Sequence, residues 1–132
     1  MDEETFRAAL TDHRARHPNP WEPAAQAELQ QLHLTRADVL EGLADAAAAA
    51  EALAHLRAAE DIQWTMGSES TSAGEGMASM SRLYEIRARR ARMCERLGER
   101  DEALSLWEGI AADPNGLGKF AVPEVARLQA GR

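Results

Sequence analysis

The amino-acid sequence predicts an all-α protein, either a helical bundle or a set of stacked helical hairpins, with about five to six helices. Alanine and leucine, which lose little side-chain entropy in a helix, dominate its apolar residues, whereas β-branched residues are scarce. Apolar residues recur at helical spacing, and no segment shows the alternation typical of a strand. Prolines and glycines punctuate the helical segments. We expect residues 1–132 to form a single helical domain.

The N-terminal half predicts three helices. The first spans residues 2–16 and ends before a proline-rich turn, because proline disfavours helical geometry in the residue before it. The second begins at Pro23, where the missing N–H of proline costs nothing, and ends near Leu34. A capping-box pattern at residues 35–38 predicts the start of a third helix that continues to about Met66. Its many alanines predict a central helix that neighbouring helices approach closely.

The C-terminal half predicts three further helices. The polar Gly/Ser segment 67–76 is expected to form a flexible loop. A fourth helix over residues 77–97 ends at the following glycine, which suits a helix C-terminus. A fifth helix begins at Asp101 and continues through Ile110, and a short last helix begins at Val122.

Charge is distributed unevenly along the chain. The formal net charge is −7, and residues 1–66 carry all of this excess, while residues 67–132 are balanced. Within the second half, residues 82–100 contain seven arginines and three glutamates. Non-specific nucleic-acid binding needs a broad basic surface, so an acidic chain makes a nucleic-acid partner unlikely.

Other features indicate a cytoplasmic protein with no cofactor. The single cysteine, Cys94, has no disulfide partner within the chain and suits a reducing compartment. The acidic N-terminus lacks the pattern of a secretory signal, and no apolar run is long enough to span a membrane. Arginine greatly outnumbers lysine in an alanine-rich chain, which indicates a bacterial source. Neither a phosphate-binding loop nor a GxSxG nucleophile motif is present.

The fourth predicted helix carries the most informative pattern. An apolar stripe that includes Leu83 and Ile86 adjoins a basic face. The arginines on this face are Arg82, Arg89, Arg92, Arg96 and Arg100. The face is interpreted first as solvated and balanced by acids of the third helix, with Asp38, Glu41 and Asp45 as natural partners. A docking face for an acidic protein segment is the functional alternative, since arginine binds carboxylates in bidentate fashion; a phosphate ligand is the third.

Arg90 and Trp64 stand apart from this face. Arg90 falls within the apolar stripe, where an unpaired charge is costly, so it needs a carboxylate or carbonyl partner or a place at an interface. A ligand-contacting role in a cavity is the alternative for Arg90. Trp64 precedes the polar segment and is either part of the core or an exposed contact residue.

His13 and His17 are candidate metal ligands, because a spacing of four residues brings two imidazoles to one side of a helix. His17 precedes Pro18, however, and is pushed away from helical geometry. His33 and His55 have no metal-ligand spacing to this pair. The sequence therefore favours a pair of histidines without a metal ion.

Residues 84–115 resemble part of a tetratricopeptide repeat. The matching residues are Ala91, Leu97, Gly98, Ala103, Trp107 and Pro114. The resemblance implies two antiparallel helices joined at Gly98, in a protein-interaction scaffold without catalysis. It covers one partial repeat, where stable arrays need about three. Arg87 and Arg90 stand where the repeat usually has large apolar side chains, and Ile110 replaces a small one.

Taken together, these features predict a non-enzymatic helical interaction module or assembly subunit, with a homodimer as one form. Its expected contact residues are Arg82, Arg89, Arg90, Arg92, Arg96 and Trp64. One alternative is a helical bundle that binds a small molecule or anion and has a possible catalytic role. Another is a small phage- or transcription-related helical protein.

Overall fold

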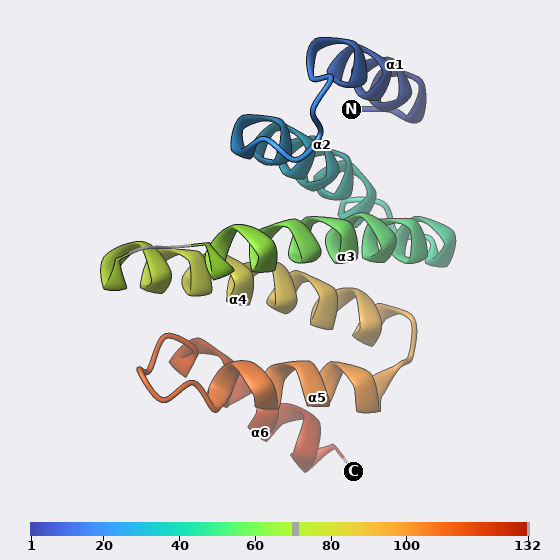
Figure 1. The fold of residues 1–132 in the computed structure, drawn as a ribbon. Helices are drawn as coiled ribbons and strands as arrows, with labels where there is room; N and C mark the ends of the chain where they lie inside the picture. The colour runs from blue at the N-terminus through green and yellow to red at the C-terminus, as the bar shows by residue number, and fades with distance from the viewer. Residues whose placement is uncertain (70–71, 132) are drawn as a thin grey trace.

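The computed structural model of the chain describes residues 1–69 and 72–131, and no strand occurs among them, which confirms the all-α prediction. The helices are α1 (Glu3–Arg16), α2 (Pro23–Glu41), α3 (Ala46–Ser68), α4 (Ala73–Arg96), α5 (Arg100–Ala111) and α6 (Val122–Ala130). A short 3₁₀ turn, Lys119–Ala121, precedes α6. The helices are stacked in chain order, with α1 at one end and α6 at the other (Figure 1).

Each helix packs chiefly against its neighbours in the sequence, and α3 lies between α2 and α4 (Figure 1). The alanines of α3 make this arrangement possible. Ala49, Ala52 and Ala59 are completely buried, as is Ala91 on α4. Because a methyl group projects little from the helix, neighbouring helices approach closely at these positions. The predicted role of the alanine-rich segment as a central helix is confirmed.

Large side chains fill the core from α3 to α5. Leu56 of α3, Cys94 of α4, and Trp107 and Ile110 of α5 are all inaccessible to solvent. Removal of this apolar surface from water is the main force that holds consecutive helices together. Cys94 belongs to this core, as its place in the apolar stripe predicts.

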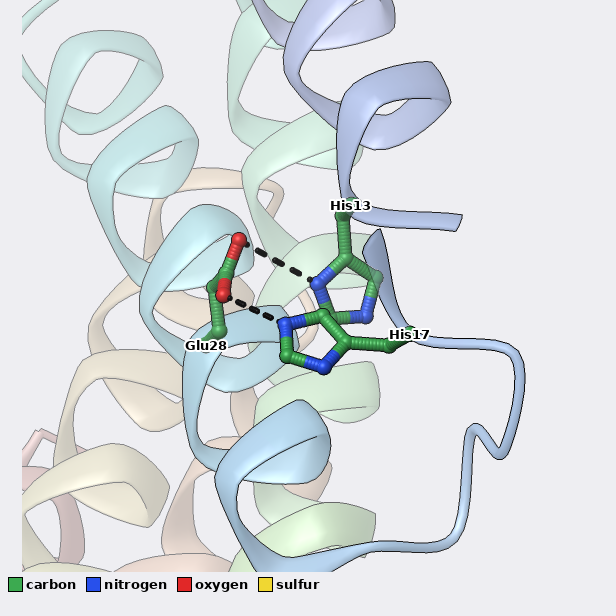
Figure 2. Close-up of side chains that lie close together, drawn as sticks. All are labelled: His13, His17 and Glu28. Carbon is green, nitrogen blue, oxygen red and sulfur yellow. Dashed lines mark hydrogen bonds and ion pairs between the residues drawn. The ribbon is translucent and has the colours of Figure 1, made fainter. Parts of the chain in front are cut away.

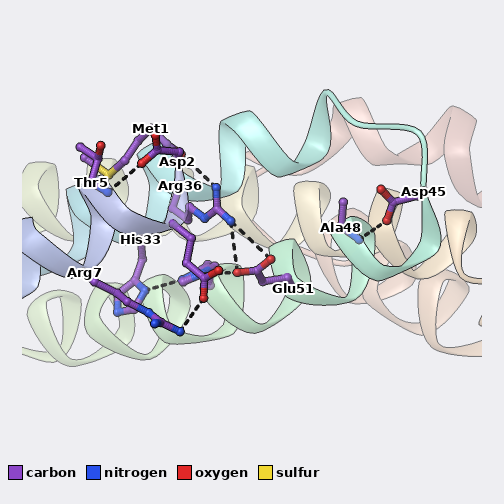
Figure 3. Close-up of polar contacts among 11 residues, drawn as sticks. Met1, Asp2, Thr5, Arg7, His33, Arg36, Asp45, Ala48 and Glu51 are labelled. Carbon is purple, nitrogen blue, oxygen red and sulfur yellow. Dashed lines mark hydrogen bonds and ion pairs between the residues drawn. The ribbon is translucent and has the colours of Figure 1, made fainter.

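The predicted boundary between the second and third helices is wrong. Residues 35–38 do not cap a new helix but lie within α2, which continues to Glu41. Leu34, Ala37 and Leu40 extend one buried face across the predicted boundary. The break comes after Gly42, and the Asp45 side chain caps α3 by accepting a hydrogen bond from the Ala48 N–H at 2.7 Å (Figure 3).

The predicted loop at residues 67–76 is mostly helical. Residues 67–68 complete α3 and residues 73–76 begin α4, while residues 70–71 lie outside the described residues. Ser72 caps α4 by accepting a hydrogen bond from the Glu75 N–H at 3.1 Å. The serines and glycines thus form helix ends, because a serine side chain satisfies one of the free N–H groups of a first turn.

Two glycines permit close turns in the C-terminal half. Gly98, with φ of 76°, ends α4, and the Glu99 N–H donates to the Cys94 carbonyl at 2.8 Å. α5 then returns antiparallel to α4 (Figure 1). At Gly118, a Cβ atom would lie 1.7 Å from the carbonyl oxygen of Ile110, so only glycine lets the segment before α6 approach α5 this closely.

α1 is held against α2 and α3 by an aromatic contact and by a charged contact, and Figure 3 shows the charged one. Phe6 is buried, with its ring centroid 5.6 Å from that of His33 and 4.8 Å from that of His55. The two imidazole Nδ1 atoms lie 2.9 Å apart. Beside them, Arg36 donates to the Met1 carbonyl at 3.0 Å and pairs with Glu51 at 3.3 Å.

Because of this histidine pair, we expect the folded protein to lose stability in mild acid. Burial first, and the nearby His55 second, lower the pKa of His33 from 6.5 to about 4. The unfolded chain therefore takes up a proton below pH 6.5 more readily than the folded chain does. The stabilising effect of neutral His33 is fully present above pH 6.5 and is lost as the pH falls to 4. Urea denaturation at a series of pH values should show this decline.

The matched variant for this prediction is His33→Gln, which keeps a polar side chain but does not titrate. We expect its stability to depend less on pH between 6.5 and 4 than that of the wild type. Equal pH dependence of the two proteins in this window would contradict the assignment to His33.

Candidate functional site

The basic face of α4 is partly used to hold the helices together. Arg89 Nη2 lies 2.6 Å from Glu41 Oε2 and 2.5 Å from Asp38 Oδ1. Burial lowers the pKa of Arg89, but the carboxylates of Glu41 and Asp38 together outweigh it and raise the pKa above its usual value. These contacts confirm the predicted pairing with Asp38 and Glu41, whereas Asp45, the third predicted partner, caps α3.

Arg96 extends this contact between α4 and the turn after α2. Its guanidinium donates to the carbonyl of Glu41 at 2.8 Å and also to the carbonyl of Leu43. These carbonyls have no partner within α2, because they lie at or beyond its C-terminal end. Arg96 therefore satisfies backbone acceptors, a role that the charge pattern alone did not predict.

Arg90 lies in a half-buried ion-pair cluster. Its guanidinium donates to Glu60 Oε2 on α3, and it lies 3.8 Å from Glu102 Oε1 on α5. Arg87 donates to the other oxygen of Glu60 at 2.7 Å. The predicted need for a carboxylate partner of Arg90 is confirmed. Glu60, which the sequence did not single out, joins two arginines of α4 to α3.

A groove runs along α4 next to the segment that precedes α6. It has a volume of about 420 Å³. It is lined by Ser81, Glu85, Ala88, Arg89, Arg92, Leu117 and Phe120. The Arg92 guanidinium lies 5.5 Å from the ring centroid of Trp107, within the range of a cation–π interaction. Arg92 makes no ion pair and no side-chain hydrogen bond with any residue that the structure describes. Phe120, which also lines the groove, is 47% exposed.

Arg82 and Trp64 are both exposed, at different places. Arg82 lies on α4 at the exposed end of the basic face. Trp64 is 57% exposed and lines a cavity of about 140 Å³ between α3 and α4, together with Gly76 and Met80. This exposure agrees with the interpretation of Trp64 as a contact residue and not with its interpretation as a core residue. The structure does not bring Trp64 into the groove that contains Arg92.

His13 and His17 lie together at the end of α1, and Glu28 of α2 faces both (Figure 2). His13 Nδ1 is 3.4 Å from Glu28 Oε1, and His17 Nε2 is 2.9 Å from Glu28 Oε2. His17 has left helical geometry, with φ of −124° and ψ of 81°, as Pro18 predicts. Its ring centroid nevertheless stays 4.8 Å from that of His13.

The Glu28 carboxylate is strongly held in its ionised form. Hydrogen bonds from Arg16 first, and from His17 second, lower the pKa of Glu28 to about 2. Arg16 also donates to Asp12 at 2.8 Å. Sequence reasoning missed Glu28 because it considered spacing within one helix. The available signal was the proline-rich turn at residues 18–23, which folds α2 back along α1.

A second group of potential metal ligands consists of Cys94, Glu99 and Glu102. Burial, followed by the charge of Glu102, raises the pKa of the Cys94 thiol to about 11. Because the thiolate is the metal-binding form, this shift makes Cys94 a weaker ligand than an ordinary cysteine. Its contacts are those of a core residue.

Comparison with known protein families, curated proteins and solved structures found no match to the chain. In the part of the chain that the structure describes, no helix combines the length and apolar character needed to cross a membrane. α4 and α5 form an antiparallel helical hairpin joined at Gly98, but residues 1–69 and 72–131 give no evidence for a tetratricopeptide repeat.

Proposed function

We propose that the protein is a non-enzymatic helical interaction module of a bacterial cytoplasm, and that α4 docks a carboxylate-bearing segment of a protein partner. A second copy of the chain, as in a homodimer, is one such partner. The observation that carries this proposal is the groove along α4, in which Arg92 and an exposed aromatic side chain, Phe120, lie together.

The chemistry of the groove supports this kind of partner. A guanidinium that has no carboxylate partner is available for bidentate binding of one. Its contact with Trp107 orients the guanidinium, so less side-chain freedom is lost on binding. Phe120 offers apolar surface beside it, and arginine and aromatic residues are the types that dominate binding energy at interfaces.

The other arginines of α4 take a different part in this proposal. Arg89, Arg90 and Arg96 already hold acids or carbonyls within the chain, so they shape the face and contribute little free charge to it. Arg82 extends the accessible basic surface towards the start of α4. Trp64 would serve as a separate contact near the C-terminal end of α3.

A pull-down that compares the wild-type protein with a groove variant as baits tests this function. The double variant Arg92→Glu/Phe120→Ala should retain about tenfold less partner protein than the wild-type bait, because it loses both a charged and an apolar contact. Self-association, measured as mass by light scattering over a range of concentrations, should fall in the same variant if the partner is a second copy.

Arg14→Glu on α1 is the matched control, since Arg14 is exposed and remote from α4. Its partner recovery should equal that of the wild type, and the circular dichroism of all variants should be unchanged. Equal recovery by the double variant, or a wild-type protein that neither self-associates nor retains a partner, would contradict the proposal.

A further inference from the structure

We infer that His13, His17 and Glu28 form a binding site for a divalent transition-metal ion such as Zn²⁺ at the corner between α1 and α2. This inference is independent of the groove along α4, because the two sites lie on different helices. It rests on three observations: the ligand types, their separations, and a buried nitrogen atom without a hydrogen-bond partner.

The three side chains are of the types that bind such ions. Two imidazoles and one carboxylate form a common three-residue ligand set for zinc, which leaves a fourth position open to water. Glu28 of α2 supplies the carboxylate, and the two imidazoles come from the end of α1.

The donor atoms lie close enough to reach one shared ion after small side-chain rotations, although the two histidines face different oxygens of Glu28. With metal–ligand bonds of about 2.0–2.2 Å, donors in a tetrahedral site lie about 3.4 Å apart. The distance from His13 Nδ1 to Glu28 Oε1 is 3.4 Å, and that from His17 Nε2 to Glu28 Oε2 is 2.9 Å. The whole group lies within 4.8 Å, so only small side-chain rotations are needed to bring all three donors to one ion.

The buried nitrogen of His13 points independently to a ligand. The His13 residue is only 4% exposed, and its Nδ1 atom makes no hydrogen bond to a described residue; its contact with Glu28 Oε1, at 3.4 Å, is an ion-pair distance (Figure 2). A buried polar atom that makes no hydrogen bond is unfavourable for the folded state. A metal ion at this position would accept the Nδ1 lone pair and remove that cost.

The site is accessible and has one built-in competitor. The side chains of His17 and Glu28 are 17% and 31% exposed, which leaves a path to solvent. Arg16 now shares the Glu28 carboxylate with the histidines. Arg16 bonds the same two oxygens that the histidines face, but since it also binds Asp12, it keeps an acidic partner when a metal ion displaces it from Glu28.

Calorimetric titration of metal-stripped full-length protein with Zn²⁺ tests the site, with Co²⁺ absorption as a second readout. We expect one ion to bind per chain, with visible Co²⁺ bands of tetrahedral intensity and a raised melting temperature. His17→Ala and Glu28→Gln should each weaken binding by about tenfold or more. Arg16→Gln should strengthen it, because it removes a competing cation.

The matched control is His55→Gln, which removes an imidazole from the other histidine pair and leaves this site intact. It should bind Zn²⁺ as the wild type does. His17 is half-buried at a helix end, so His17→Ala should keep its fold, which circular dichroism verifies. Absence of Zn²⁺ binding by the wild type, or unchanged affinity in both His17→Ala and Glu28→Gln, would overturn the inference.

Discussion

Replacing Trp107 with alanine is expected to lower the free energy of unfolding by about 3–5 kcal/mol. Trp107 is completely buried in the core between α4 and α5, so its removal leaves a large cavity. The change also removes the hydrogen bond from its Nε1 to Glu95 Oε2, at 3.0 Å, and the surface beneath Arg92. Urea denaturation monitored by circular dichroism measures this loss.

Two controls separate the causes of the Trp107 effect. Trp107→Phe keeps most of the ring volume but not the hydrogen bond, so it should lose less stability than the alanine variant. Trp21→Ala removes the same kind of side chain from a position that is 80% exposed, and should change stability by less than about 0.5 kcal/mol. Similar losses in the Trp21 and Trp107 alanine variants would contradict the packing of α5 described here.

Glu60→Ala is expected to lower the free energy of unfolding by about 3 kcal/mol. The substitution leaves the half-buried Arg90 with only the distant carboxylate of Glu102, at 3.8 Å. Arg87 also loses its partner, but its side chain is 30% exposed and reaches water. Urea denaturation measures this loss. If the slope of the unfolding free energy against urea concentration is unchanged, the loss belongs to the folded state.

The control for Glu60 removes both charges. In the double variant Glu60→Met/Arg90→Met, no buried charge is left unpaired, so most of the lost stability should return. A double variant as unstable as Glu60→Ala would show that the ion pair itself, and not the stranded charge, stabilises the stack. A loss of less than about 1 kcal/mol in Glu60→Ala would contradict the buried position of this pair.

The fold class and most helices could be predicted from local signals in the sequence. The prolines near residue 18 and at position 23, and the glycine at position 98, mark helix ends because they restrict or extend backbone geometry. The boundary near Leu34 was wrong because a capping-box pattern also occurs inside a helix. Continuous burial of Leu34, Ala37 and Leu40 overrides this local preference.

The candidate sites were harder to predict because their residues meet only through packing between helices. The charge pattern predicted that the basic face pairs with Asp38, Glu41 and Asp45, but it did not show that Arg89 is the arginine that binds the first two. Nothing local indicated that Glu60 partners Arg90, or that Phe120 lies beside Arg92. Those contacts depend on how helices are rotated about their axes, which helical periodicity alone leaves open.

The central claim is that the arginines of α4 are divided, with Arg89 and Arg90 holding the stack together and Arg92 available to dock a partner. The most direct test is the dissociation constant of the purified complex for wild-type protein and Arg92→Glu, measured with Arg14→Glu alongside. We predict that the constant rises by about tenfold or more for Arg92→Glu, with no change in melting temperature, and stays at the wild-type value for Arg14→Glu. Equal affinity of the Arg92→Glu and wild-type proteins would contradict the claim.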